Sequence, residues 1–147
     1  MRIADILRTK GSTVATVTQT TTVTALLAEL AVHNIGALVV LGDSGNTDVA
    51  GIVSERDVVR GLQEHGPDLL RRPVADIMSA VVVTCGPDDP VDDLAALMTH
   101  NRVRHVPVLD DGRLAGIVSI GDVVKVRMEE LAAERQQLEA YITQATT

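Results

Sequence analysis

The 147-residue chain contains no Trp and no Phe, and its one aromatic side chain is Tyr141. Proteins that bind single-stranded nucleic acid usually stack bases on aromatic side chains, so this class is disfavoured. Any planar ligand must therefore be held by aliphatic side chains and by the backbone. The hydrophobic fraction is nevertheless 46%, mostly Val, Leu, Ile and Ala. This suffices for one domain with a core, or for two small units that support each other.

Cysteine is scarce, and the chain carries no net positive charge. Cys85 is the only cysteine and cannot form an internal disulfide, which favours a cytoplasmic protein. A formal net charge of −7 disfavours a nucleic-acid partner, because neutralising phosphates needs a basic face. No apolar run approaches the roughly 18 residues of a membrane span, and residues 1–10 do not resemble a signal peptide. We therefore expect a soluble, intracellular protein with no membrane or nucleic-acid partner.

Patterns typical of catalysis and metal binding are missing from the sequence too. It has no Gly-x-x-x-x-Gly-Lys-Ser/Thr motif and no nucleophile with an identifiable base partner. His100 and His105 lack the accompanying Cys or Glu of a zinc site, and the aspartates around Pro90 lack the pattern of a calcium loop. We predict that the protein is not an enzyme and has no metal site and no required cofactor.

What the sequence does contain is one segment that occurs twice. Residues 51–59 and 116–124 differ only where Glu55-Arg56 is replaced by Ile120-Gly121. The similarity continues upstream, with an offset of 71 residues near the N-terminus, then 68, then 65. Each change of offset falls in a loop-like stretch, where a change of length costs little free energy. The chain is therefore an internal duplication.

Hydrophobic periodicity predicts the same elements in each copy. Strands are expected in the ranges 14–17, 35–41, 51–54, 81–84, 103–109 and 116–119. Helices are expected after Pro90 and from Asp57 and Asp122 onward. Each copy thus has the order β-α-β-β-α. We predict an α+β fold in which two such repeats pack about a pseudo-two-fold axis, with an extended C-terminal helix.

The first repeat is placed at residues 1–66, the second at 67–130, and a C-terminal helical extension and tail at 131–147. The extension continues a helix with a seam spaced alternately by four and three residues: Val124, Met128, Leu131, Arg135, Leu138 and Ile142. Two arrangements are compatible with this seam. The helix either folds back over the core of its own module or forms a dimer contact.

The duplicated Gly-apolar-apolar-Ser-x-x-Asp segment, following β-α-β-β in each copy, closely resembles the CBS domain; a tandem pair is called a Bateman module. The resemblance covers roughly residues 1–130. It implies a regulatory protein that binds an adenosine-containing ligand (AMP, ADP, ATP, NAD(H) or S-adenosylmethionine) in the clefts between its units, as in energy sensing. It also implies a homodimer that signals to an unidentified regulated protein by conformational change. The alternative is a ligand-free dimerisation scaffold with vestigial sites.

The resemblance and the residue chemistry together suggest the contacts. Ribose or phosphate would be held by Ser54, Asp57, Ser119 and Asp122, because a carboxylate at a helix start can accept hydrogen bonds from both ribose hydroxyls. The alternative is that these residues only cap their helices. Phosphate would be held by Arg56, Arg104 and His105, and the base would lie near Val17, Ile35, Ala37, Val83 and Val103. Since Arg104 and His105 have Gly36 and Ala37 as counterparts, we expect two unequal sites.

Overall fold

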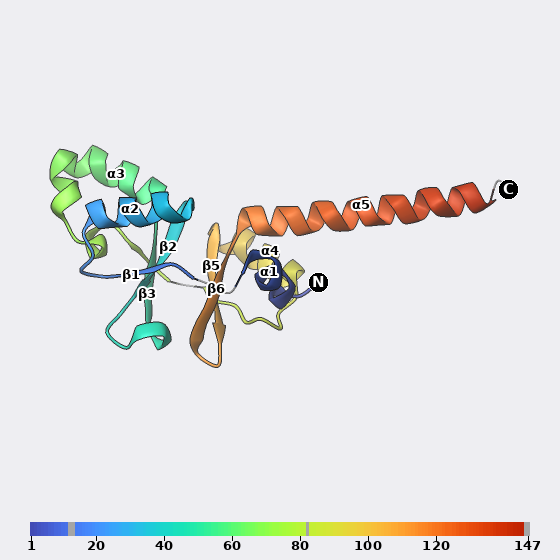
Figure 1. Cartoon of the computed structure of the whole chain (residues 1–147), viewed down its shortest axis with the longest axis horizontal. Helices are drawn as coiled ribbons and strands as arrows, with labels where there is room; N and C mark the ends of the chain where they lie inside the picture. Colours follow the sequence, from blue (N-terminus) through green and yellow to red (C-terminus); the bar gives the residue numbers. More distant parts are fainter. Residues whose placement is uncertain (12–13, 82, 146–147) are drawn as a thin grey trace.

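The computed structural model describes residues 1–11, 14–81 and 83–145. The first half contains α1 (Ile3–Lys10), β1 (Thr16–Thr18), α2 (Val23–His33), β2 (Ala37–Leu41), the 3-10 turn η1 (Gly45–Thr47), β3 (Val49–Ser54) and α3 (Glu55–His65). The second contains η2 (Gly66–Arg71), η3 (Val74–Asp76), β4 (Ser79–Ala80), α4 (Val91–Asn101), β5 (His105–Asp110), β6 (Arg113–Ser119) and α5 (Ile120–Ala145). The predicted α+β fold with a long C-terminal helix is confirmed (Figure 1).

Two small sheets lie side by side in the centre of the molecule (Figure 1). The first has the order β1-β2-β3-β4, in which β1 is parallel to β2, and the second is the antiparallel pair β5-β6. All five residues of β2 are buried, because α2 and α3 cover one face of this sheet and the second unit lies against the other. The apolar run 35–41 therefore does form a buried strand, although the strand begins only at Ala37.

The strand predicted at 81–84 is not formed by the described residues of that range, and Val82 lies outside them. The segment that follows, at Cys85, pairs with β5 through a single parallel bridge to Val108. In this bridge the Cys85 amide donates to the Pro107 carbonyl at 3.1 Å, and the Leu109 amide donates to the Cys85 carbonyl at 2.8 Å. Extending this parallel ladder by one more hydrogen bond would require an N–H group at residue 107. This residue is a proline, which has no N–H to donate. The proline thus ends the ladder, and the preceding β4 pairs with β3 of the first sheet instead.

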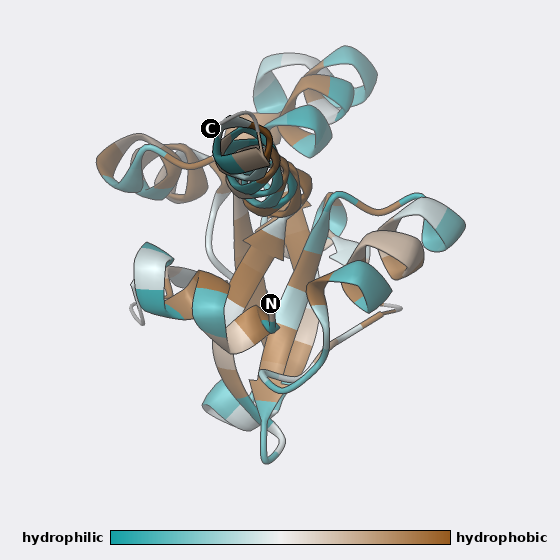
Figure 2. Cartoon of the chain, turned by 90° about the vertical axis from the view of Figure 1, so that its right-hand side faces the viewer, coloured by the Kyte–Doolittle hydropathy of each residue, from teal (hydrophilic) through white to brown (hydrophobic). Residues whose placement is uncertain are grey.

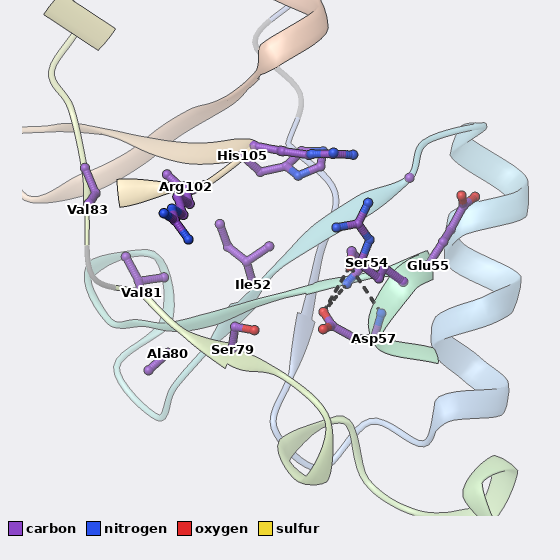
Figure 3. A pocket seen from close by; sticks show the side chains of 14 residues that line it. Ile52, Ser54, Glu55, Asp57, Ser79, Ala80, Val81, Val83, Arg102 and His105 are labelled. Carbon is purple, nitrogen blue, oxygen red and sulfur yellow. Dashed lines mark hydrogen bonds between the residues drawn. The ribbon is translucent and has the colours of Figure 1, made fainter. Parts of the chain in front are cut away.

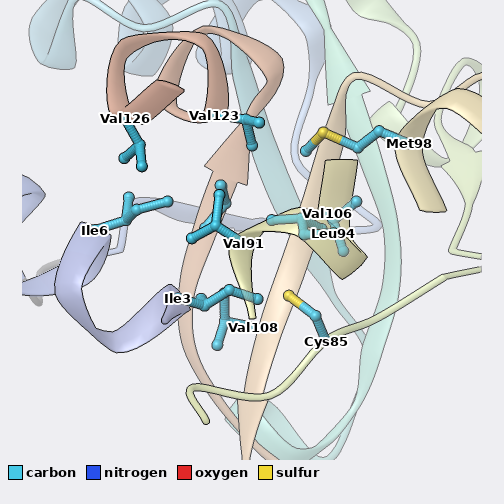
Figure 4. Packing of buried hydrophobic residues seen from close by; sticks show 11 residues of the cluster. Ile3, Ile6, Cys85, Val91, Leu94, Met98, Val106, Val108, Val123 and Val126 are labelled. Atoms are coloured by element: carbon cyan, nitrogen blue, oxygen red, sulfur yellow. The ribbon is translucent and has the colours of Figure 1, made fainter. Parts of the chain in front are cut away.

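The hydrophobic core forms two clusters, and each includes a segment from the other half of the chain. In the second unit, Ile3 and Ile6 of α1 pack with side chains from α4, β5, β6 and the start of α5 (Figure 4). In the first unit, Leu69 and Val74 from the connection after α3 pack with α2, β2 and β3. Ile3, Leu69 and Val74 are all 0% exposed. The two units therefore exchange segments, and their cores cross the proposed repeat boundary at residue 66 in both directions.

The glycines of the duplicated segment lie where the exchanged segments meet the sheets. A Cβ added at Gly51 would lie 2.5 Å from the carbonyl oxygen of Ser79, and a Cβ added at Gly116 would lie 2.5 Å from a methyl carbon of Leu7. Both distances are shorter than van der Waals contact, so a larger residue would have to push away the backbone of β4 at Gly51 and displace the Leu7 side chain at Gly116. The repeated glycine is thus explained by repeated close packing.

Helix α5 has 26 residues and projects from the body of the protein (Figure 1). Figure 2 shows it end-on, in front of the predominantly hydrophobic strands. Val123 and Val126 in its first turns are buried, whereas Met128, Leu131 and Leu138 are between 62% and 66% exposed. The helix therefore covers its own core only at its start, and the rest of its apolar seam lies on the surface. Among the residues that the structure describes, no helix has the length and hydropathy needed to cross a membrane.

Candidate functional site

Two cavities lie between the units, and each is built from both halves of the chain. The first cleft, of about 500 Å³, is lined by β3, its neighbour β4 and the start of α3 from the first sheet and its helix, and by residues 81, 83 and 102–105. The second cleft, of about 400 Å³, is lined by α1, residues 35–37, β6 and His105. Both volumes fall in the range of small-molecule sites.

The acidic corner of the first cleft is Asp57, in the first turn of α3 (Figure 3). Its Oδ2 accepts hydrogen bonds from the Ser54 amide at 2.8 Å and from the Ser54 hydroxyl at 3.1 Å. The Asp57 amide in turn donates to Ser54 Oγ at 3.4 Å, which completes a capping box. All of these bonds at the carboxylate use Oδ2. Within the described part of the chain, Oδ1 is therefore left as an acceptor for a ligand.

Basic side chains gather in the same cleft, where Arg56 of α3 is joined by Arg102, Arg104 and His105 from the second half. Arg102 lies at the end of α4 with a φ of 54°, a left-handed turn that leads the chain into β5. The structure thus brings the three predicted phosphate contacts to one cleft, together with a fourth basic residue. Their role in binding phosphate stays a prediction.

The imidazole of His105 lines both clefts and is half-buried. Burial lowers its pKa below the ordinary value, and the nearby positive charges of Lys10 and Arg104 lower the pKa further. The ring is therefore neutral at pH 7. It can offer a hydrogen bond to an anion, but not a full positive charge.

The equivalent aspartate of the second unit, Asp122, lies beside the second cleft, which Ser119 lines, and it is held in the same way but with an additional ion pair. Asp122 Oδ2 accepts from the Ser119 amide at 2.9 Å and from the Ser119 hydroxyl at 3.0 Å. It also accepts from Lys10 Nζ at 2.8 Å, and Lys10 donates to the Ile117 carbonyl at 2.9 Å. Burial raises the pKa of Asp122, but the hydrogen bonds from Lys10 and Ser119 outweigh burial, so the pKa is lowered. The carboxylate is therefore charged and already paired.

The residues predicted to surround the base fall in three places. Val83 and Val103 line the first cleft, and Ile35 and Ala37 line the second. Val17 instead packs in the core of the first unit and is 6% exposed, which corrects its assignment to a base pocket. The reason is that successive side chains of a strand point in opposite directions, and Val17 is on the face turned toward the core.

Lys10 and Arg102 were not among the predicted site residues, although the repeat alignment contains a signal for both. At an offset of 71, Lys10 is aligned with Val81, and at an offset of 68, Arg102 is aligned with Asn34. Both are places where one copy has a basic residue and the other does not. Such differences between otherwise similar copies mark the residues that make the two clefts unequal.

Two clefts thus lie between two similarly built units; a capped aspartate lines the first cleft, and the aligned capped aspartate lies next to the Ser119 that lines the second. A model of the CBS domain matches residues 3–64 and matches again at residues 74–129. The chain belongs to the CBS-domain family as a tandem pair, and the resemblance seen in its sequence is confirmed.

Relatives of known sequence or structure agree with this placement. "CBS domain-containing protein CBSX3, mitochondrial" of Arabidopsis thaliana is 37% identical over 146 residues, which are 95% of this chain and 71% of that protein. The crystal structure of the CBS-domain containing protein ATU1752 from Agrobacterium tumefaciens is 42% identical, with a TM-score of 0.80, and the match covers 86% of this chain and 99% of that chain. CBS domain protein PAE2072 from Pyrobaculum aerophilum, solved in complex with AMP, is 28% identical, with a TM-score of 0.73 and coverage of 83% and 89%.

Proposed function

We propose that the protein is a non-catalytic regulatory module that binds an adenosine nucleotide in the first cleft. The observation that carries the proposal is the composition of this cleft, which combines the open carboxylate of Asp57 with three arginines and apolar walls. A related CBS pair is known in complex with AMP. AMP, ADP, ATP and NAD(H) all share the adenosine monophosphate unit that such a cleft would recognise.

Each part of AMP has a matching group in the first cleft. The two ribose hydroxyls would donate to Asp57 Oδ1, since a carboxylate accepts charge-assisted hydrogen bonds from a diol. The phosphate would lie among Arg56, Arg102 and Arg104, because guanidinium groups bind phosphate oxygens in pairs. Val83 and Val103 would cover the faces of the base, and backbone groups would bind its edge. No aromatic side chain is needed for this mode of binding.

Ligand binding at this position supports a signalling function. The first cleft joins the start of α3 in one unit to β5 in the other, so a bound nucleotide contacts both units at once. A ligand that prefers one relative placement of the units shifts the population toward it. A regulated protein, whose identity is open, would respond to this change and thereby sense nucleotide levels.

The direct test is thermal unfolding in the presence of AMP. At an AMP concentration one hundred times its Kd, the complex should gain about 2.7 kcal/mol, which raises Tm by roughly 5–10 °C. As the matched control, 2′-deoxy-AMP should give a clearly smaller shift, because it offers Asp57 only one ribose hydroxyl. If AMP, ADP, ATP and NAD all leave Tm unchanged, the scaffold alternative is correct and the clefts are vestigial.

We also propose that the protein is a homodimer held together by the projecting part of α5. The supporting observation is the exposed seam that includes Met128, Leu131 and Leu138. Seam spacing of this kind suits packing against a second helix of the same kind. A second copy of the chain presents the same seam, so it offers a matching surface.

The dimer is tested by introducing a charge into the seam. Leu131→Glu should raise the dimer dissociation constant roughly thirtyfold or more, because burying a leucine contributes about 1.5–3 kcal/mol. Sedimentation velocity over a range of protein concentrations measures this constant. Ala133→Glu adds the same charge to the opposite side of the helix and should leave the constant nearly unchanged. A wild-type chain that sediments as a monomer at every concentration would rule the dimer out.

We also propose a cellular location, the cytoplasm. The sequence predicts a cytoplasmic protein, whereas CBSX3 is named as mitochondrial. We keep the cytoplasmic location as the proposal, because it follows from the composition of this chain itself.

A further inference from the structure

The two acidic corners share one architecture but differ in what their carboxylates face. Asp57 lines the first cleft directly. Asp122 does not have the same access to the second cleft: Ser119 lines that cleft, while Asp122 lines a separate cavity of about 670 Å³. Lys10 lines both of these cavities, so its side chain lies at the boundary between the second cleft and the cavity that Asp122 lines.

The exchange of segments places Lys10 in this position. Lys10 is the last residue of α1, which packs on the second unit through Ile3 and Ile6. The close contact between Leu7 and Gly116 holds this end of α1 against β6. Lys10 Nζ is then fixed at two points, by Asp122 Oδ2 at 2.8 Å and by the Ile117 carbonyl at 2.9 Å. The aligned residue of the first cleft is Val81, which has no charge to offer Asp57.

Lys10 therefore removes two recognition groups from the second cleft at once. The charge of the Asp122 carboxylate, which would strengthen its bonds to the ribose hydroxyls, is neutralised by the Lys10 ammonium group at Oδ2, and the carboxylate does not line the second cleft. Among the described residues that line the second cleft, Lys10 is the only Lys or Arg, and its charge is already engaged by Asp122. The first cleft, in contrast, has an open carboxylate and three arginines.

We propose that Lys10 is a specificity-determining residue that closes the second cleft to nucleosides, so that the first cleft is the main nucleotide site. The inference rests on the proposed nucleotide binding of the first cleft. A ribose that enters from the second cleft meets Lys10, which lines that cleft, before it reaches Asp122, which does not, and it finds a carboxylate whose charge is already balanced. Substituting Lys10 with a residue of similar length but no charge should open this corner.

The test measures adenosine binding by equilibrium dialysis while the first cleft is kept saturated with AMP. Under this condition, adenosine that binds the protein reports on the second cleft. Lys10→Met should lower the adenosine Kd by about two- to fivefold relative to wild type, the range expected for a partly exposed ion pair. Lys125→Met makes the same chemical change in a neighbouring lysine of α5 and should leave the adenosine Kd unchanged. The double variant K10M/D122N should lose the gain, because it no longer has the freed carboxylate.

The outcomes separate this inference from the function on which it rests. If AMP binds but the adenosine Kd is the same in wild type and in Lys10→Met, Lys10 does not close the cleft and the inference is overturned while the proposed function stands. A weaker affinity in Lys10→Met would also overturn it, because Lys10 would then be a ligand contact. If neither protein binds AMP, both the proposed function and the inference fail. Unfolding curves of each variant check that the fold is retained.

Discussion

Replacing Asp57 with Asn should weaken AMP binding by about ten- to a hundredfold, because hydrogen bonds to a charged group contribute about 1.5–3 kcal/mol. Asparagine keeps one oxygen that can cap α3 with Ser54, so the helix start is retained while the charged acceptor for the ribose is lost. Titration calorimetry with AMP gives the change in Kd. The variant should also bind AMP and 2′-deoxy-AMP with similar affinity, since the discrimination between them depends on Asp57.

A suitable control for this variant is Asp93→Asn, which makes the same change in the first turn of α4, outside the lining of both clefts. Its AMP affinity should stay within about twofold of wild type, as for most surface substitutions. An Asp57→Asn protein that folds normally and binds AMP as well as wild type would show that the ribose is bound elsewhere.

Replacing Leu69 with Ala should lower the free energy of unfolding by about 2–5 kcal/mol, the range measured for buried leucines that leave a cavity. Leu69 is 0% exposed, and a Cβ added at Gly61 of α3 would lie 2.9 Å from both of its methyl carbons. The side chain thus fills space directly against α3. Urea unfolding measures the loss, and Tm should fall by roughly 5–15 °C.

The adjacent Leu70 provides a matched control in the same 3-10 turn, because it is 37% exposed. Leu70→Ala should change the free energy of unfolding by less than about 1 kcal/mol. Equal losses in the two variants would mean that the turn itself, and not the buried contact with the first core, carries the stabilisation.

Local patterns account for most of what could be predicted from the sequence. The Ser-x-x-Asp segments predicted both capped helix starts, because a capping box joins residues only three apart. The apolar run of β2 predicted a strand buried on both faces. The expected inequality of the clefts followed from aligned positions such as Gly36 and Arg104, which are visible without a structure.

Features that depend on distant pairing could not be predicted in this way. The segments 3–7 and 74–78 match each other in the repeat alignment, but sequence similarity does not say which unit's core each one enters. The effect of Pro107 on the pairing with residue 85 follows only once these two segments are known to lie side by side. The Lys10–Asp122 ion pair joins residues 112 positions apart. Its effect on the second cleft becomes visible only when α1 is placed on the second unit.

The exchange of segments between the units has a consequence for how the protein folds. During synthesis, the first unit lacks Leu69 and Val74 until the connection to the second repeat has emerged, so its core cannot be completed early. Contacts between α1 and the last elements of the second unit must wait for almost the whole chain. Such contacts have a large sequence separation and slow the folding of a domain. The duplicated halves are therefore expected to fold together as one cooperative unit, even though each carries the complete sequence pattern of a repeat.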